Sequence, residues 1–293
     1  LGTYNMDVRQ FGAALSERTR AIFLPHTLGN PAPMDEVTAF AREHNLYLIE
    51  DCCDALGSTF DGRMVGTFGQ LATLSFYPAH HITMGEGGAV FTNSFRLARL
   101  ARTLRDWGRD CWCEYINPPN GKCGIRFERE IPGLPGTYDH RYYFTEIGYN
   151  LKVTDTQAAI GVAQLDKLPD FIAARKRNFR RLYAGMQRFE QHLILPRWHP
   201  KADPSWFAFP ITVRDQAPFS RRDLMTFLEG RHIETRMLFA GNILKQPGYR
   251  NITRRVIGDL PNSEQVLRGS FFVGVYPGLD DERIDYMLEA FGD

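Results

Sequence analysis

Two short apolar runs enclose a helical pattern near the beginning of this 293-residue chain, and this order constrains the fold more than any other feature. Residues 21–27 (AIFLPHT) and 46–51 (LYLIED) each suit one buried strand, while residues 34–44 between them place apolar side chains at helical spacing. A strand, a helix and a second strand joined by short loops predict a parallel pair with a right-handed crossover. An α/β fold is therefore expected.

Strand and helix patterns continue along the chain. Residues 71–78 and 87–93 are further strand candidates, and Asn93 or Ser94 can cap the helix that follows. Residues 108–147 are rich in Gly, Pro, Cys and aromatic residues without a clear period. A connection of this length is either functional or loosely ordered.

A second region begins near the middle of the chain, where Thr154 and Gln157 fit a capping box that starts a helix. We therefore predict two domains. Residues 1–170 form a large domain with an insertion at 108–147, and residues 171–293 form a connecting helix and a smaller α+β domain. Within the smaller domain the patterns predict strands at 207–213 and 271–277 and helices at 220–230 and 284–291.

The composition excludes several classes of function. The 35 basic and 34 acidic residues give a formal net charge of +1, which argues against nucleic acid or a membrane surface as the main partner. No apolar run is long enough to span a membrane, and the first residues lack the pattern of a signal peptide. We predict a cytoplasmic protein. Because the chain starts with Leu1 rather than methionine, we also expect that it begins within a longer protein.

Candidate site residues follow two of the predicted strands. Asp51 ends the strand at 46–51, and open α/β sheets bind ligands beyond the carboxyl ends of their strands. It is either a capping or solvated residue, or the partner of a protonated pyridine nitrogen in a pyridoxal-type cofactor. His80 and His81 follow the strand at 71–78, and they are metal ligands, a general base or ordinary loop residues.

All five cysteines lie in one part of the chain, between Cys52 and Cys123. Their odd number and the size of the chain argue against a secreted disulfide scaffold. In a cytosolic protein such a group indicates metal or redox chemistry, and four thiolates can form a structural zinc site.

These motifs together resemble the sugar aminotransferase branch of the fold-type I pyridoxal phosphate (PLP) enzymes. The resemblance rests on the order of Asp51, Ser75 and the turn at 85–88 (GEGG), and on the motif GYNLKVTDTQAAIGVAQLDKL at 148–168. It implies a three-layer α/β large domain whose N-terminal part is missing, a smaller C-terminal domain and a homodimer. In that dimer Asn150 would approach the cofactor phosphate of the neighbouring subunit.

Three positions near the cofactor depart from the family pattern. His80 stands where the family has the lysine that forms the Schiff base, and an imidazole cannot form an imine. The resemblance therefore implies pyridoxamine 5′-phosphate (PMP) bound without a covalent bond, with His80 as a catalytic base. Asp54 and Phe207 replace other residues beside the cofactor, and Ser75 is a further cofactor-binding candidate. Tyr77 either assists catalysis or packs at the strand end.

This combination is similar to the nucleotide-sugar C-3 dehydrases, whose best-known substrate is CDP-4-keto-6-deoxyglucose in the biosynthesis of 3,6-dideoxysugars of the O-antigen. The subgroup implies a [2Fe–2S] cluster, with Cys52 as a bystander. The implied reaction is a C-3 dehydration that depends on PMP, followed by a two-electron reduction. That reduction requires a separate flavin or iron–sulfur reductase. The implied cluster ligands are Cys53, Cys111, Cys113 and Cys123.

Some roles and functions stay open at this point. Arg236 either meets the substrate diphosphate or forms a surface ion pair. The alternatives to the proposed reaction are a PMP-dependent 3-dehydratase without a cluster, a PLP-dependent sugar aminotransferase, and a non-catalytic homologue. The aminotransferase is disfavoured because the first lysine in the chain is Lys122.

Overall fold

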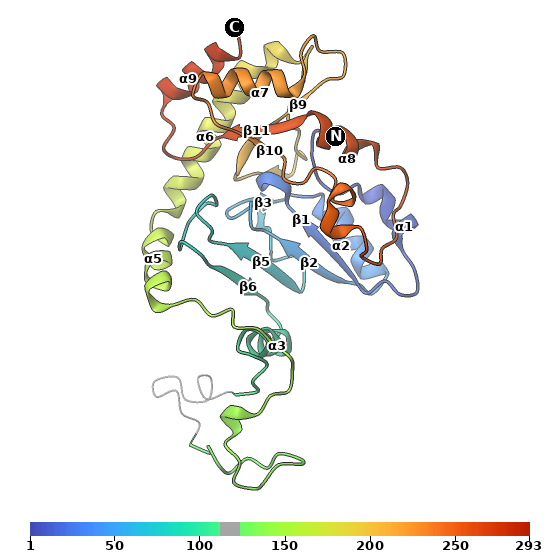
Figure 1. Cartoon of the computed structure of the whole chain (residues 1–293), viewed down its shortest axis with the longest axis vertical. Helices are drawn as coiled ribbons and strands as arrows, with labels where there is room; N and C mark the ends of the chain where they lie inside the picture. The colour runs from blue at the N-terminus through green and yellow to red at the C-terminus, as the bar shows by residue number, and fades with distance from the viewer. Residues whose placement is uncertain (112–123) are drawn as a thin grey trace.

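The computed structural model describes residues 1–111 and 124–293, and its first half is built on a four-stranded sheet (Figure 1). The strands lie in the order β1-β2-β5-β6, with β1, β2 and β5 parallel and β6 antiparallel to β5. The predicted parallel pair is confirmed, and so is the α/β fold. The bounds are β1 (Ala21–Pro25), β2 (Tyr47–Asp51), β5 (Leu71–Ser75) and β6 (Gly88–Phe91).

One face of this sheet packs against α1 (Phe11–Ala14) and α2 (Met34–Glu43), whose apolar side chains join those of β1 and β2 in one buried cluster. On the opposite face the side chains of Phe23 and Val90 are more than half exposed. Side chains alternate along a strand, and the register therefore places Asp51 on this second face as well. The candidate carboxylate thus lies on the more open side of the sheet.

The chain leaves this sheet through α3 (Phe95–Arg105), which begins at Ser94, where the hydroxyl accepts a hydrogen bond from the Leu97 amide. The described residues between 108 and 147 then extend away from the sheet beyond α3 (Figure 1). Their helical structure is limited to one short 3-10 helix at His140–Tyr142. This agrees with the lack of a period in the sequence of the segment.

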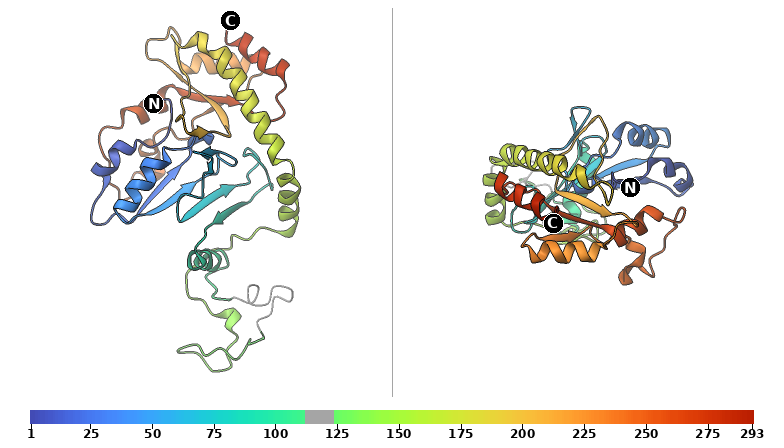
Figure 2. Two further views of the ribbon diagram at one scale, coloured as in Figure 1. Left: turned by 180° about the vertical axis from the view of Figure 1, so that it is seen from behind. Right: turned by 90° about the horizontal axis from the view of Figure 1, so that it is seen from above.

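Two helices then run from the first sheet to the second half of the molecule (Figures 1 and 2). The predicted capping box of Thr154 and Gln157 is present at the start of α5 (Asp155–Leu165). α6 (Leu168–Met186) follows after a short break, with Pro169 in its first turn, where the missing amide hydrogen has no effect on the helix. No helix in the described part of the chain combines the length and the apolar character that crossing a membrane requires.

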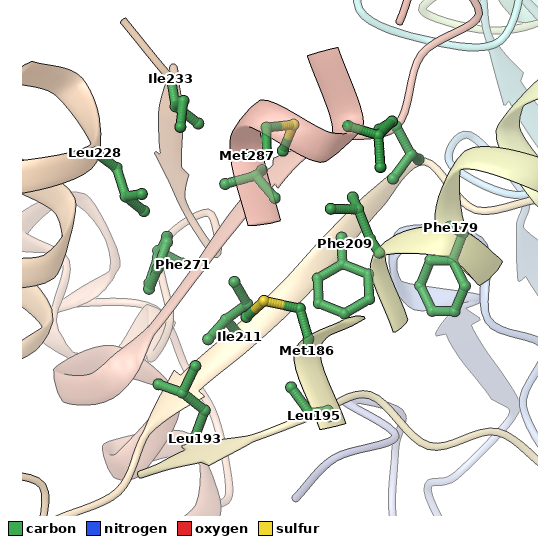
Figure 3. Packing of buried hydrophobic residues seen from close by; sticks show 14 of the residues in the cluster. Phe179, Met186, Leu193, Leu195, Phe209, Ile211, Leu228, Ile233, Phe271 and Met287 are labelled. Carbon is green, nitrogen blue, oxygen red and sulfur yellow. The ribbon is translucent and has the colours of Figure 1, made fainter. Parts of the chain in front are cut away.

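The second sheet is antiparallel and lies in the order β10-β11-β9-β7. Side chains of α6, α7 and α9 pack against its β9 and β11 strands in the largest buried cluster (Figure 3). Seen from above, α6 and α9 lie side by side (Figure 2). The bounds are β7 (Leu193–Ile194), β9 (Ala208–Val213), β10 (Thr235–Met237), β11 (Ser270–Gly274), α7 (Arg221–Gly230), α8 (Pro261–Gly269) and α9 (Asp281–Ala290).

A small third sheet connects the two halves of the chain. β8 (Ala202–Asp203) pairs with β3 (Thr59–Phe60), which also pairs with β4 (Arg63–Met64). Leu28, in the loop after β1, packs against Ala208 of β9 and adds a second connection. The boundary near residue 170 stays a prediction.

Candidate functional site

The carboxyl end of the first sheet presents two of the predicted site residues. Asp51 and Ser75 are the last residues of β2 and β5, and the register places both on the face that carries Phe23. The Asp51 carboxylate accepts a hydrogen bond of 3.0 Å from the amide of Cys53. It is only half-buried, and its strand-end position is where open α/β sheets bind ligands.

His80 lies in the loop after β5, with its imidazole facing Asp54. His80 Nδ1 and Asp54 Oδ1 are 3.3 Å apart, which is within ion-pair distance, although the atoms are not aligned as a hydrogen bond. The ring centroids of Phe207 and Tyr77 lie 5.4 and 6.4 Å from that of His80. The fold thus brings together residues from distant parts of the sequence. A carboxylate beside Nδ1 favours a proton on that nitrogen, which leaves Nε2 able to act as a base.

The neighbouring histidine has a different environment. His81 is buried, and its Nε2 donates a hydrogen bond of 2.8 Å to the carbonyl oxygen of Ser205. Burial, together with the positive charge of Arg175, lowers the pKa of His81 to about 3. His81 is therefore a neutral group that connects this loop to the second half of the chain.

The buried His81 should make the protein sensitive to acid. In the unfolded chain its pKa returns to 6.5, so lowering the pH below that value adds a proton to the unfolded state but not to the folded one. We expect this group alone to lower the free energy of unfolding by about 2 kcal/mol between pH 7 and pH 5. Urea unfolding of His81→Gln and the parent protein at both pH values measures the difference. An equal loss of stability in the two proteins contradicts the prediction.

Arg175, which was not among the predicted site residues, is buried on α6 at helical spacing with Phe179, Leu182 and Met186. An arginine among the core-facing residues of a helix was the signal that could have revealed it. Its guanidinium donates hydrogen bonds to the carbonyl oxygens of Phe207 at 2.9 Å and of His80 at 3.4 Å.

A second group that the sequence did not reveal lies beneath the site. Glu50, one residue before Asp51, is fully buried and faces His26 at 3.2 Å. Burial by itself would raise the pKa of Glu50, but hydrogen bonds from His26 and from the amides of Gly66 and Gly69 outweigh this and lower it. The side-chain atoms of His26, Glu50 and Cys52 lie within 4.8 Å of one another, as metal ligands would. Because the Glu50 oxygens already accept four hydrogen bonds, the group supports the loop rather than offering a metal site.

The two adjacent cysteines have different surroundings. Cys52 is buried in an apolar cluster with Ala55 and Ala72. Cys53 is half-buried, and burial together with a hydrogen bond to Asp51 raises its pKa to about 12. Its thiol therefore stays protonated unless a cation stabilises the thiolate. Of the other predicted cluster ligands, Cys111 is the last residue of the described range 1–111, and Cys113 and Cys123 lie outside the described residues.

Two other candidate residues lie apart from the His80 group. Asn150 forms a strand-like bridge with Asp106, and its side-chain oxygen accepts a hydrogen bond of 3.0 Å from Lys152. Arg236, on β10, is exposed and forms an ion pair with Glu234. No hydrogen bond or ion pair in the described residues joins either of them to His80, and their roles stay predictions.

Comparison with known proteins places the whole chain in one family, because the model of the DegT/DnrJ/EryC1/StrS aminotransferase family matches residues 2–292. The chain is 49% identical over 289 residues to the lipopolysaccharide biosynthesis protein RfbH of Salmonella typhimurium, a match that covers 99% of this chain and 66% of that protein. It is 52% identical over 293 residues to the dTDP-4-dehydro-2,6-dideoxy-D-glucose 3-dehydratase of Saccharopolyspora spinosa, covering 100% of this chain and 63% of that protein. The chain thus spans about two thirds of the length of these curated relatives.

Solved structures show the same fold. The GDP-4-keto-6-deoxy-D-mannose-3-dehydratase of E. coli, solved with bound hydrated PLP, has a TM-score of 0.83 and 26% identity, covering 99% of this chain and 71% of that chain. An aminotransferase from Psychrobacter cryohalolentis has a TM-score of 0.84 and 27% identity, covering 99% and 72%. The fold is therefore that of the PLP-dependent aminotransferases, as the motifs around Asp51 and His80 implied. This chain belongs to the DegT/DnrJ/EryC1/StrS aminotransferase family.

Proposed function

We propose that the protein catalyses a PMP-dependent C-3 dehydration of a nucleotide-linked 4-keto-6-deoxyhexose. The observation that carries this proposal is the 3.3 Å approach of His80 Nδ1 to Asp54 Oδ1, at a residue to which the motif resemblance assigns the position of the Schiff-base lysine. A histidine there can move a proton but cannot bind the cofactor covalently. Two relatives named as 3-dehydratases, with GDP- and dTDP-linked substrates, support the same class of reaction. CDP is proposed for this chain.

The residues present fit a pyridoxamine cofactor. The half-exposed carboxylate of Asp51 can hold the pyridine nitrogen protonated, and its position at a strand end suits that contact. When bound, the cofactor supplies an amine that condenses with the C4 ketone of the sugar and a ring that accepts electrons. Ser75, Asn150 and Phe207 are proposed as further cofactor contacts.

The residues around His80 each have a proposed task in proton transfer. With PMP bound, His80 Nε2 would take the proton from the C4′ carbon, and the Asp54 carboxylate would stabilise the imidazolium that results. The Phe207 ring packs beside the imidazole, tilted to it at a centroid distance of 5.4 Å, and is proposed to limit access of water. The imidazolium would then give its proton to the C3 hydroxyl of the sugar, which would leave as water. Tyr77 is close enough to His80 to assist, and Arg236 is proposed to contact the substrate diphosphate.

We further propose a [2Fe–2S] cluster, a homodimer and a separate reductase. Cys53, Cys111, Cys113 and Cys123 would hold the cluster, which would supply single electrons for reduction of the dehydrated sugar. Cys53 is half-buried, and its raised pKa disfavours a thiolate without a nearby cation. An iron centre provides such a cation, because coordination deprotonates the thiol.

Substitution of the adjacent cysteines tests the cluster. After anaerobic preparation of the full-length protein, we expect about two iron atoms and two sulfides per chain. Cys53→Ala should lose most of this iron and the visible absorption, whereas Cys52→Ala, a change within the apolar cluster, should keep both. If Cys53→Ala retained its iron, a residue other than Cys53 would be the cluster ligand. An iron-free parent protein would favour the cluster-free dehydratase, and stoichiometric zinc would favour a structural metal site.

A further inference from the structure

Arg175 is a positively charged side chain that is buried in the protein interior, where the loss of hydration disfavours a charge. Its side chain lies on α6 and only 3% of the residue is exposed. Desolvation lowers its pKa to about 10, and this effect is opposed by the negative charge of Asp54. A buried guanidinium destabilises a core unless its hydrogen bonds and charge are matched, so its presence calls for a specific task.

The hydrogen bonds of Arg175 all go to backbone carbonyl oxygens on two separate segments. Nη1 donates to Phe207 at 2.9 Å and to Trp206 at 3.4 Å, and Nη2 donates to His80 at 3.4 Å. One rigid, planar group thus joins the loop that carries His80 to the segment that carries Phe207. A lysine at this position could not reach the same set of acceptors in one plane.

The two segments that Arg175 joins set the surroundings of the His80 imidazole. The Phe207 backbone amide also donates to the Leu28 carbonyl oxygen at 2.9 Å, which fixes that segment against the loop after β1. The Phe207 ring lies 5.4 Å from the His80 ring, and Asp54 approaches His80 Nδ1. Displacing the His80 backbone would therefore alter both contacts of the imidazole at once.

We propose that Arg175 is a positioning residue for His80. Through its hydrogen bonds to the backbone of His80 and Phe207, Arg175 holds the His80 imidazole between Asp54 and Phe207. This inference rests on the proposed function, in which His80 moves a proton. A displacement of about 1 Å from a reactive geometry can lower a rate by about 100-fold. We therefore expect Arg175→Met to lower kcat by about 10- to 100-fold with little change in KM, since the proposed substrate contacts lie elsewhere.

The experiment compares Arg175→Met, Arg175→Lys and the control Arg177→Met in the full-length protein with PMP. Arg177 is exposed on the same helix, so its substitution changes the same residue type outside the core. Arg175→Lys keeps the charge and some of the donors, and it should recover part of the kcat. Measurements are made well below the melting temperature of each variant, so that loss of folded protein does not enter kcat.

A spectroscopic readout separates this inference from the proposed function. In nitrogen-15 spectra of the histidine rings, Arg175→Met should shift the His80 signals and leave those of His192 and His232 in place. Unchanged His80 signals, or a kcat within twofold of the parent protein, would overturn the positioning role. If the His80 signals shift but the parent protein shows no sugar dehydration, the contact stands and the proposed function fails.

Discussion

Substitution of His80 by asparagine is expected to lower the rate of sugar dehydration by about 100- to 10,000-fold, the range for loss of a general base. The amide of asparagine has no basic nitrogen, so it cannot take a proton from the cofactor. The change is small, and Asp54 can accept a hydrogen bond from the new amide group. We expect the fold and the affinity for PMP to stay nearly unchanged.

The measurement is the rate of product formation with PMP and a CDP-linked 4-keto-6-deoxyhexose, together with PMP affinity by equilibrium dialysis. His232→Asn is the matched control. His232 is exposed and has a positive φ of 60°, a backbone conformation that asparagine tolerates. A His80→Asn protein with more than a tenth of the parent activity would show that another group is the base. Equal losses in both variants would indicate a general effect on the fold.

Much of the fold could be predicted from local patterns. Strands β1 and β2 coincide with apolar runs, and their parallel pairing followed from the helix between them, but only alternate side chains of each strand are buried. The capping box at Thr154 was correct because it depends on residues only three positions apart. The ends of elements were less certain: β11 stops at Gly274, before the end of the apolar run at 271–277. Apolar character continues into the loop there because Val275 joins the core without a strand partner.

The candidate site was predictable where it depends on position in a motif. His80 and Asp54 were identified because each departs from a family pattern, and the fold then places them 3.3 Å apart. Arg175 and Glu50 were not identified, because all hydrogen-bond partners of Arg175 and three of the four partners of Glu50 are backbone groups brought close by tertiary packing. Such partners have no side-chain identity that a sequence can reveal. The only available signal was a charged residue within an apolar pattern, as in the strand that contains Glu50.

Glu50 organises the loop beneath the site through hydrogen bonds to both of its oxygens. Oε1 accepts from the amides of Phe68 and Gly69 at 2.8 and 2.6 Å, and Oε2 accepts from Gly66 at 2.7 Å. Oε2 also faces His26 Nε2 at 3.2 Å, while His26 Nδ1 accepts from the Ala32 amide. Because His26 Nδ1 accepts the Ala32 hydrogen bond, the proton of the neutral imidazole lies on Nε2, and Nε2 therefore donates to the Glu50 carboxylate. Each ring nitrogen of His26 and each carboxylate oxygen of Glu50 can therefore act only as a donor or only as an acceptor.

Replacing Glu50 with glutamine should break this arrangement although the two side chains have the same shape. One carboxylate oxygen becomes an NH₂ group, which would face N–H donors from Gly66 and His26 or from Phe68 and Gly69. His26 cannot relieve the conflict by moving its proton, because its Nδ1 would then face the Ala32 amide. We expect the free energy of unfolding to fall by about 2–6 kcal/mol, since two buried N–H donors lose their acceptor at roughly 1–3 kcal/mol each, and the melting temperature to fall by about 10 °C.

Urea unfolding and thermal melting of Glu50→Gln measure this cost, and Glu43→Gln is the control. Glu43 is a surface residue, with 73% of its side chain exposed and 3.9 Å from His44, and such pairs contribute less than about 1 kcal/mol. A loss below about 1 kcal/mol in Glu50→Gln would mean that the loop at 66–69 can rearrange to satisfy its donors. Because Glu50 adjoins Asp51 on β2, a large loss would also explain why a buried carboxylate precedes the proposed cofactor contact. It holds in place the strand end on which that contact depends.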